Sequence, residues 1–171
     1  MLIPAQTSLM GLPSGEAAVM ATARAMRLII RQQAARPLVR AHAVRLSQWC
    51  GPTDPVCRLR RIAAWVREHL RFVPDPIGVE AITTPDAHLL VINQEGVSAG
   101  DCDDAAVLAG ALARSIGAPV RIALASFRAD KQLHHTWAEG MAAGVGRWID
   151  LDPFRSERTA PKPSRLIYLG V

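Results

Sequence analysis

Apolar residues recur every three or four positions in the N-terminal third of the chain, which is the spacing of amphipathic helices. This spacing predicts one helix over residues 16–35 and another over residues 55–69. A shorter helix is expected over residues 38–49, before a Gly-Pro pair that stops it. Thr53 or Asp54 can cap the helix that follows, since both side chains accept hydrogen bonds from a helix start. Pro55 suits the first helical position.

The second half of the chain changes from helical spacing to strand-like alternation. A run of small and aliphatic residues over 103–116 predicts a central helix that can pack closely on a sheet, and Gly117 suits its C-terminal end. Alternation and turn glycines then predict four strands. These strands are expected over residues 119–126, 134–141, 147–153 and 166–171.

Two segments carry few signals for helix or strand. Residues 1–15 contain two prolines and two glycines and are expected to be irregular. Residues 72–92 are also expected to be rich in loops, because three prolines and a glycine interrupt them. This second segment is either a rigid surface loop or one wall of a substrate groove, and the sequence leaves both interpretations open.

Composition places the chain among globular proteins. Half of its 171 residues are hydrophobic and a fifth are charged, which is enough apolar material for one domain with a real core. No stretch has the length and apolarity of a membrane span. The N-terminus lacks the basic region and apolar core of a secretory signal, so synthesis in the cytoplasm is expected.

The three cysteines are not expected to form a disulfide framework in a domain of this size. Their spacing also fits no common zinc motif. Cys50 and Cys57 are interpreted as small buried hydrophobic residues, with a zinc site that includes His42 as the alternative. No metal or organic cofactor is expected.

Positive charge is concentrated in the first part of the chain. Residues 1–71 hold 11 arginines and three acidic residues, a net charge of +8, whereas residues 72–171 have a net charge of −3. The preferred interpretation is a set of solvated helix faces. A nucleic-acid partner is not expected, because no aromatic-interleaved basic stripe is evident, although steeply salt-dependent DNA binding would revive that alternative.

The segment Gly100-Asp101-Cys102-Asp103-Asp104 places a thiol at the start of the predicted central helix. The helix dipole and the free N–H groups at that end favour a thiolate, which is the nucleophilic form of cysteine. The adjacent carboxylates oppose thiolate formation. Cys102 is therefore the candidate nucleophile, and its backbone N–H is a candidate oxyanion donor.

A base and an orienting acid follow along the chain. His135 is preferred to His134 because it shares a strand face with Trp137. Asp152 and Asp150 share a face of a later strand, so residue parity alone cannot choose between them. The order Cys, His, Asp suits a triad in which imidazole activates sulfur and carboxylate orients imidazole.

These residues resemble the transglutaminase-like branch of the papain-like superfamily. The family pattern Gly-x-Cys-x-Asp corresponds to Gly100, Cys102 and Asp104, and His-x-Trp corresponds to His135 and Trp137. The pattern Trp-x-x-x-Asp-Pro begins at Trp148, and it selects Asp152 over Asp150. The resemblance implies that Asp104 is a structural acid near the helix start. A papain-like glutamine donor suggests Gln94 as a second oxyanion donor.

The resemblance implies an α+β fold in which the nucleophile helix packs on a small antiparallel sheet, with additional N-terminal helices. Residues 1–53 are assigned to a helical extension and residues 54–171 to the catalytic core, within one compact domain. The implied activity is that of a cysteine peptidase or amidase acting through a thioester, with an amine as the alternative acyl acceptor. The substrate would be a peptide, a protein or a peptidoglycan stem peptide.

A second hypothesis is a non-catalytic role as an assembly component of a larger complex. The compact chain and the run Pro74-Asp75-Pro76-Ile77-Gly78 also look like transglutaminase-like proteins of bacteriophages and prophages. On that resemblance the partners would include other virion proteins, and the chain would join a virion tail after synthesis in the cytoplasm.

Overall fold

The computed structural model describes residues 6–8, 15–76, 79–155 and 161–171. Its helices are α1 (Glu16–Gln33), α2 (Pro37–Ser47), α3 (Pro55–His69), α4 (Pro85–Glu95) and α5 (Cys102–Ser115). Its strands are β1 (Gln6–Ser8), β2 (Leu70–Phe72), β3 (Ala81–Thr83), β4 (Ser98–Gly100), β5 (Val120–Ser126), β6 (His135–Ala142), β7 (Arg147–Asp150) and β8 (Arg165–Gly170). The mixture confirms the α+β class.

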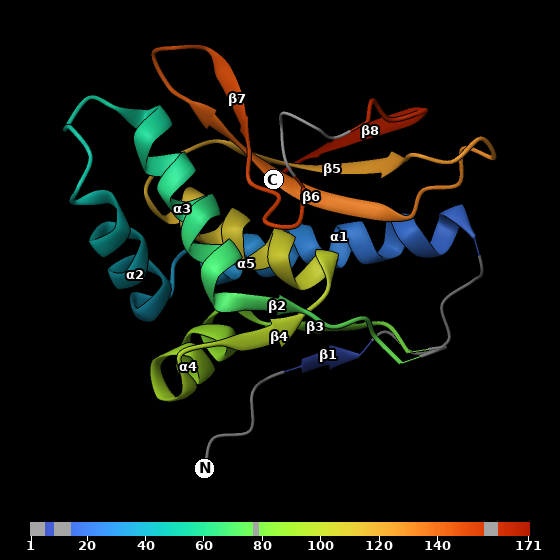
Figure 1. The fold of residues 1–171 in the computed structure, drawn as a ribbon, viewed down its shortest axis with the longest axis horizontal. Coiled ribbons are helices and arrows are strands. Elements are labelled where there is room, and N and C mark those ends of the chain that lie inside the picture. Colours follow the sequence, from blue (N-terminus) through green and yellow to red (C-terminus); the bar gives the residue numbers. More distant parts are fainter. Residues whose placement is uncertain (1–5, 9–14, 77–78, 156–160) are drawn as a thin grey trace.

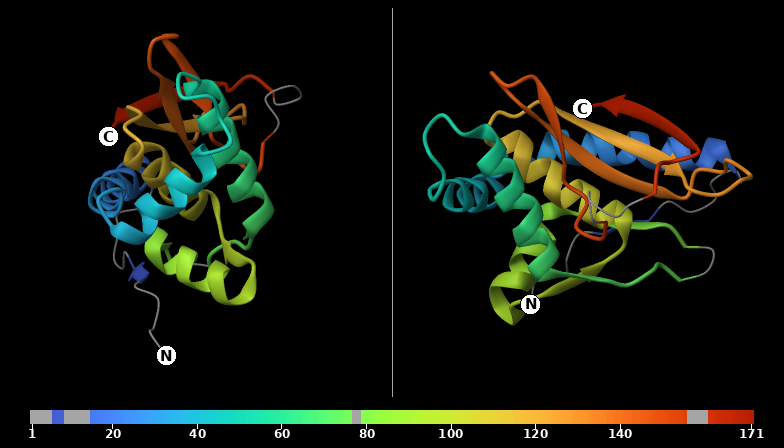
Figure 2. Two further views of the ribbon diagram at one scale, coloured as in Figure 1. Left: turned by 90° about the vertical axis from the view of Figure 1, so that its left-hand side faces the viewer. Right: turned by 45° about the horizontal axis from the view of Figure 1, so that its top comes forward.

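Helix α5 lies at the centre of the molecule (Figure 1). An antiparallel sheet of order β7-β6-β5-β8 lies on one side of it. The parallel pair β2–β4 lies with α4 on the other side, as both views of Figure 2 show. This arrangement confirms the predicted packing of the nucleophile helix on a small antiparallel sheet.

Small residues let neighbouring elements approach α5 closely. A side chain built at Gly110 would place its Cβ 2.9 Å from Ile30 of α1 and 3.4 Å from Ala138 of β6. Nearly all of α5 is buried, and one hydrophobic cluster joins it to α1, α2, α3 and the sheet. The helix therefore has little freedom to shift, which fixes the position of its first residue.

The segment predicted to be loop-rich contains an element that the prediction missed. Residues 72–92 include β3 and most of α4, so that expectation is wrong for Pro85 onward. Thr84 precedes Pro85 at the first helical position, and Gly96 ends α4 with a left-handed backbone at φ 82°. Within the N-terminal 15 residues, Gln6–Ser8 forms β1, and residues 1–5 and 9–14 lie outside the described part.

Cys50 and Cys57 form a disulfide with Cα atoms 5.8 Å apart, so their assignment as separate buried hydrophobic residues is wrong. The bridge joins the end of α2 to the first turn of α3. It also removes both sulfur atoms from any zinc site with His42. In the described part of the chain, no helix is long and apolar enough to cross a membrane.

Candidate active site

The segment Gly100–Asp104 forms the junction between β4 and α5. Asp101 caps the helix, because its Oδ1 accepts the Asp103 N–H at 2.9 Å while Asp104 Oδ2 accepts the Asp101 N–H at 3.2 Å. A Cβ at Gly100 would lie 2.6 Å from the Asp104 Cβ, so only glycine fits there. Cys102 is consequently fixed as the first residue of α5.

Asp104 connects this junction to the elements behind it. Its Oδ1 accepts the Thr83 N–H of β3 at 2.7 Å and lies 3.5 Å from Nε2 of the fully buried His88. His88 in turn contacts the Ser98 hydroxyl through Nδ1 at 2.8 Å. Asp104 thus joins three segments of chain at the start of α5.

Cys102 and His135 line one cavity of about 250 Å³. One wall comes from α1, through Val19, Thr22 and Met26, and another includes Glu80 of the segment before β3. The contribution of Glu80 agrees with the view of residues 72–92 as part of a substrate groove.

His135 is held by an acid from the end of the sheet. Its Nε2 lies 2.5 Å from Oδ2 of Asp152, whose side chain is 1% exposed. Because Nε2 has this partner, Nδ1 is the nitrogen left for a thiol. The ring of Trp137 stacks on His135 at 5.6 Å between centroids, which keeps one face of the imidazole away from water.

Arg155 supports the His–Asp pair from behind. Its Nη2 lies 2.5 Å from Oδ2 of Asp150, and its Nε lies 3.6 Å from Oδ2 of Asp152. The guanidinium also covers the Trp137 ring at 4.4 Å. Asp150 therefore pairs with an arginine, whereas Asp152 is the acid that pairs with the histidine.

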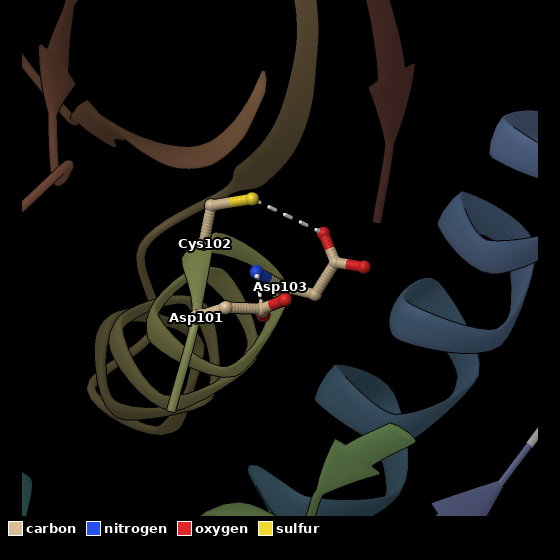
Figure 3. A group of neighbouring side chains, drawn as sticks. All are labelled: Asp101, Cys102 and Asp103. Atoms are coloured by element: carbon tan, nitrogen blue, oxygen red, sulfur yellow. Dashed lines mark hydrogen bonds between the residues drawn. The ribbon is translucent and has the colours of Figure 1, made fainter. Parts of the chain in front are cut away.

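The thiol itself lies among carboxyl groups (Figure 3). Cys102 Sγ contacts Asp103 Oδ1 at 3.7 Å, and among the described residues no hydrogen bond joins it to His135. Burial raises the pKa of the Cys102 thiol well above its ordinary value, and the charges of Asp103 and Asp101 raise it further. A hydrogen bond from the Thr136 backbone opposes this effect only in part.

The carboxyl groups are perturbed as well. Burial raises the pKa of Asp101 to about 6 and raises the pKa of Asp103 well above its ordinary value. A hydrogen bond with Glu80 also stabilises the protonated form of Asp103. The sequence led us to expect that the helix end would favour a thiolate. That expectation fails for the free protein, because desolvation and the two aspartates outweigh the helix end.

The remaining predicted residues lie farther from the thiol. Gln94 is exposed on α4 and does not line the cavity, so its location gives no support to a role as oxyanion donor. His134 is exposed at the cavity mouth, where its Nδ1 contacts the Gln132 carbonyl. Glu80 and Arg155 were not identified from the sequence as part of the site. Arg155 could have been found from its position, because it follows Asp152 by three residues.

In the described part of the chain, one group of side chains could hold a metal ion. The ligand atoms of Asp101, Cys102 and Asp103 lie within 4.8 Å of one another. The three are consecutive in sequence and belong to the capped helix end, and Asp101 already accepts a backbone N–H. Their arrangement is explained by helix capping without an ion.

A cysteine at a helix start that shares a cavity with a histidine paired to a carboxylate is typical of papain-like thiol sites. A family model described as the transglutaminase-like superfamily matches residues 43–153, well over half of the chain. The chain therefore belongs to this family, which includes cysteine-dependent enzymes. Neither the curated proteins nor the solved structures contain a match to it. Helix α1 precedes the matched region.

Proposed function

We propose that the chain is a cysteine-dependent amide hydrolase, a peptidase or amidase that works through a thioester. The observation that carries the proposal is the presence of Cys102 and His135 on one cavity while His135 is paired with Asp152. Membership of the transglutaminase-like family supports the same chemistry. Water is the proposed acyl acceptor, with a substrate amine as the alternative.

The reaction would begin with transfer of the thiol proton from Cys102 to Nδ1 of His135, while Asp152 stabilises the imidazolium. The sulfur would attack the amide carbon, and the Cys102 N–H at the helix start would stabilise the oxyanion. His135 would then protonate the leaving amine, which leaves a thioester. Water, deprotonated by the same imidazole, would release the acid and restore the thiol.

The cavity favours some substrates over others by charge. Glu80, Asp101 and Asp103 line it together with Cys102, and the described residues of its lining include no lysine or arginine. An anionic group beside the thiol would be repelled, whereas an amine-bearing residue would be attracted. A stem peptide in which a diamino acid keeps a free side-chain amine has this property, so the proposal extends to cell-wall stem peptides, and to a virion protein that would cleave them.

One observation favours a second function, a non-catalytic assembly role. The raised pKa of the Cys102 thiol means that the free chain holds a neutral, weakly nucleophilic sulfur near pH 7. A chain that kept the fold without the chemistry would show the same buried thiol. On this hypothesis the domain would serve as a structural part of a larger complex such as a phage tail.

Alkylation of Cys102 by iodoacetamide, followed across pH by peptide mass spectrometry, tests the proposal. Cys102 is the free cysteine of the chain, so without reductant the reagent reports on this thiol alone. If the site is catalytic, alkylation should slow in His135→Ala and Asp152→Asn. The neighbouring variants His134→Ala and Asp150→Asn are the matched controls and should keep the wild-type rate.

The same proteins should then be incubated with peptides that carry an amine near a scissile amide. Accumulation of an acyl-enzyme of the mass expected at Cys102, absent in Cys102→Ala, would establish the thioester. Alkylation that is slow and indifferent to His135, with no acyl-enzyme from any peptide, would reject catalysis by the chain alone and favour the assembly role.

A further inference from the structure

Two hollows on the surface adjoin each other away from the thiol cavity. One, of about 680 Å³, lies between α2, the loop before α3 and the end of α5. The other, of about 590 Å³, lies between the ends of α1 and α5. They share Arg40 and Arg114, so together they form one elongated depression, called the arginine groove below. Neither hollow shares a lining residue with the thiol cavity.

Four arginines line the arginine groove, and none of its described lining residues is an Asp or Glu. They are Arg31, Arg40, Arg58 and Arg114. In the described part of the chain, none of the four pairs with an Asp or Glu side chain. The groove is therefore a region of concentrated positive charge, and it gathers residues from four helices that the sequence keeps far apart.

Backbone oxygens hold three of these guanidinium groups in place. Arg40 donates to the Ser115 oxygen at 3.3 Å, and Arg58 donates to the Pro52 oxygen at 2.6 Å. Arg114 donates to the Val171 oxygen at 3.2 Å. The remaining N–H groups stay available, and the buried Nε of Arg58 has no hydrogen-bond partner. A guanidinium fixed in this way loses little side-chain entropy when it binds a phosphate with two parallel hydrogen bonds.

An exposed aromatic residue belongs to the segment that lines the larger hollow. Trp49 is 73% exposed and falls between Gln48 and Cys50, both of which line the larger hollow. Val44, also exposed, lines the same hollow. A large indole left in water next to a basic groove can stack on an unpaired base, and base faces are accessible only in a single strand.

We propose that the arginine groove binds single-stranded nucleic acid, with the arginines on successive phosphates and Trp49 against a base. The sequence alone gave no support for this, because Trp49 is separated along the chain from Arg31, Arg58 and Arg114. The fold brings the four arginines to one surface, and Trp49 adjoins Gln48 and Cys50, which line the same groove. The proposed ligand is a phosphodiester chain with bases, since the elongated groove suits several phosphates and the indole adds contact with a flat ring.

Fluorescence anisotropy of a labelled oligothymidylate of about 12 nucleotides tests this proposal with the full chain. Binding at about 50 mM salt should weaken steeply as salt rises, with a log–log slope of roughly −3 if four phosphates are neutralised. Arg31→Gln/Arg40→Gln should weaken binding at least tenfold. Arg24→Gln/Arg61→Gln removes the same charge from exposed positions outside the groove and should change binding less than threefold.

Trp49→Ala should weaken binding at least about fivefold, the range of one base–aromatic stack. Inorganic polyphosphate and the duplex form of the oligonucleotide should compete less well than the single strand. The proposal would be overturned if the chain did not bind at low salt, or if the two arginine double variants lost the same affinity. It would also be overturned if polyphosphate competed as well as the oligonucleotide and Trp49→Ala had no effect on binding. Cys102→Ala should bind like the wild type, because the two cavities are separate.

Discussion

Replacement of Asp101 by asparagine tests how much the buried charge of Asp101 destabilises the start of α5. The Asp101 carboxylate caps the helix through the Asp103 N–H at 2.9 Å, and an asparagine oxygen can accept the same hydrogen bond. Burial of Asp101 raises its pKa from the ordinary value of 3.8 to about 6, and the charges of Asp104 and Asp75 act in the same direction. The substitution removes the titrating charge and keeps the cap.

The sign of the effect follows from proton binding. Between about pH 4 and 6 the folded state holds a proton on Asp101 that the unfolded chain has released, so wild-type stability falls as pH rises through this window. At 1.36 kcal/mol per pKa unit the full difference is roughly 3 kcal/mol. Because the carboxyl is partly exposed and solvent screens it, we expect a loss of about 1–2 kcal/mol.

Urea unfolding of wild type and Asp101→Asn at several pH values from 4 to 8 measures this effect. Other buried acids titrate in both proteins, so the informative quantity is the difference in unfolding free energy between them. It should move by about 1–2 kcal/mol in favour of the variant from pH 4 to pH 7.5. Asp130→Asn, on an exposed turn, should give a difference that does not change with pH.

A difference for Asp101→Asn that stays constant with pH, or that moves in favour of the wild type, would refute this account of the helix end. The variant also offers a second readout, because Asp101 is one of the charges that raise the pKa of the Cys102 thiol. Its removal should therefore speed alkylation of Cys102 near neutral pH. Faster alkylation without the stability change would place the effect in access to the thiol.

Three further predictions concern stability and can be checked by urea unfolding. Gly100→Ala should lower the unfolding free energy by about 1–3 kcal/mol, because its Cβ would crowd Asp104, and an unchanged midpoint would contradict the close approach. Arg155→Gln should lower the unfolding free energy by about 1–2 kcal/mol, because the ion pair with Asp150 and the stacking on Trp137 are lost. Arg155→Lys should recover only part of this loss. Cys50→Ser/Cys57→Ser should lower the unfolding free energy by about 2–3 kcal/mol, because the unfolded chain no longer has a closed loop. Wild type in the presence of reductant should show the same loss of stability.

Local signals in the sequence were sufficient for most of the helices and strands. The start of α5 was predictable because a capping aspartate and acidic first-turn residues precede a run of small residues. Helix α4 was missed although Thr84, Pro85 and Gly96 mark its two ends. Its buried face includes His88, and a polar residue in that position obscures the apolar spacing on which the prediction relied.

Features that depend on tertiary approach were beyond the sequence. Cys50 and Cys57 lie seven positions apart, and only the turn between α2 and α3 brings their Cα atoms to 5.8 Å. The spacing of His135 and Asp152 suggested a pair, but the hydrogen bond between Glu80 and Asp103 joins segments with no shared pattern. Burial of Cys102 in the folded chain raises the pKa of its thiol. Reasoning from the helix dipole alone therefore predicted the wrong direction for this pKa shift.

Asp152 holds the imidazole of His135 through a hydrogen bond, whereas burial and the charges of Asp103 and Asp101 raise the pKa of the Cys102 thiol in the free protein. A cationic group that entered the cavity beside Asp103 would offset the carboxylate charge and so lower the pKa of the thiol. Among the described residues that line the cavity there is no lysine or arginine, so such a group would displace no basic side chain. Under the proposed function, recognition of an amine and activation of the nucleophile are therefore one electrostatic event, which would keep the sulfur unreactive until a suitable substrate binds.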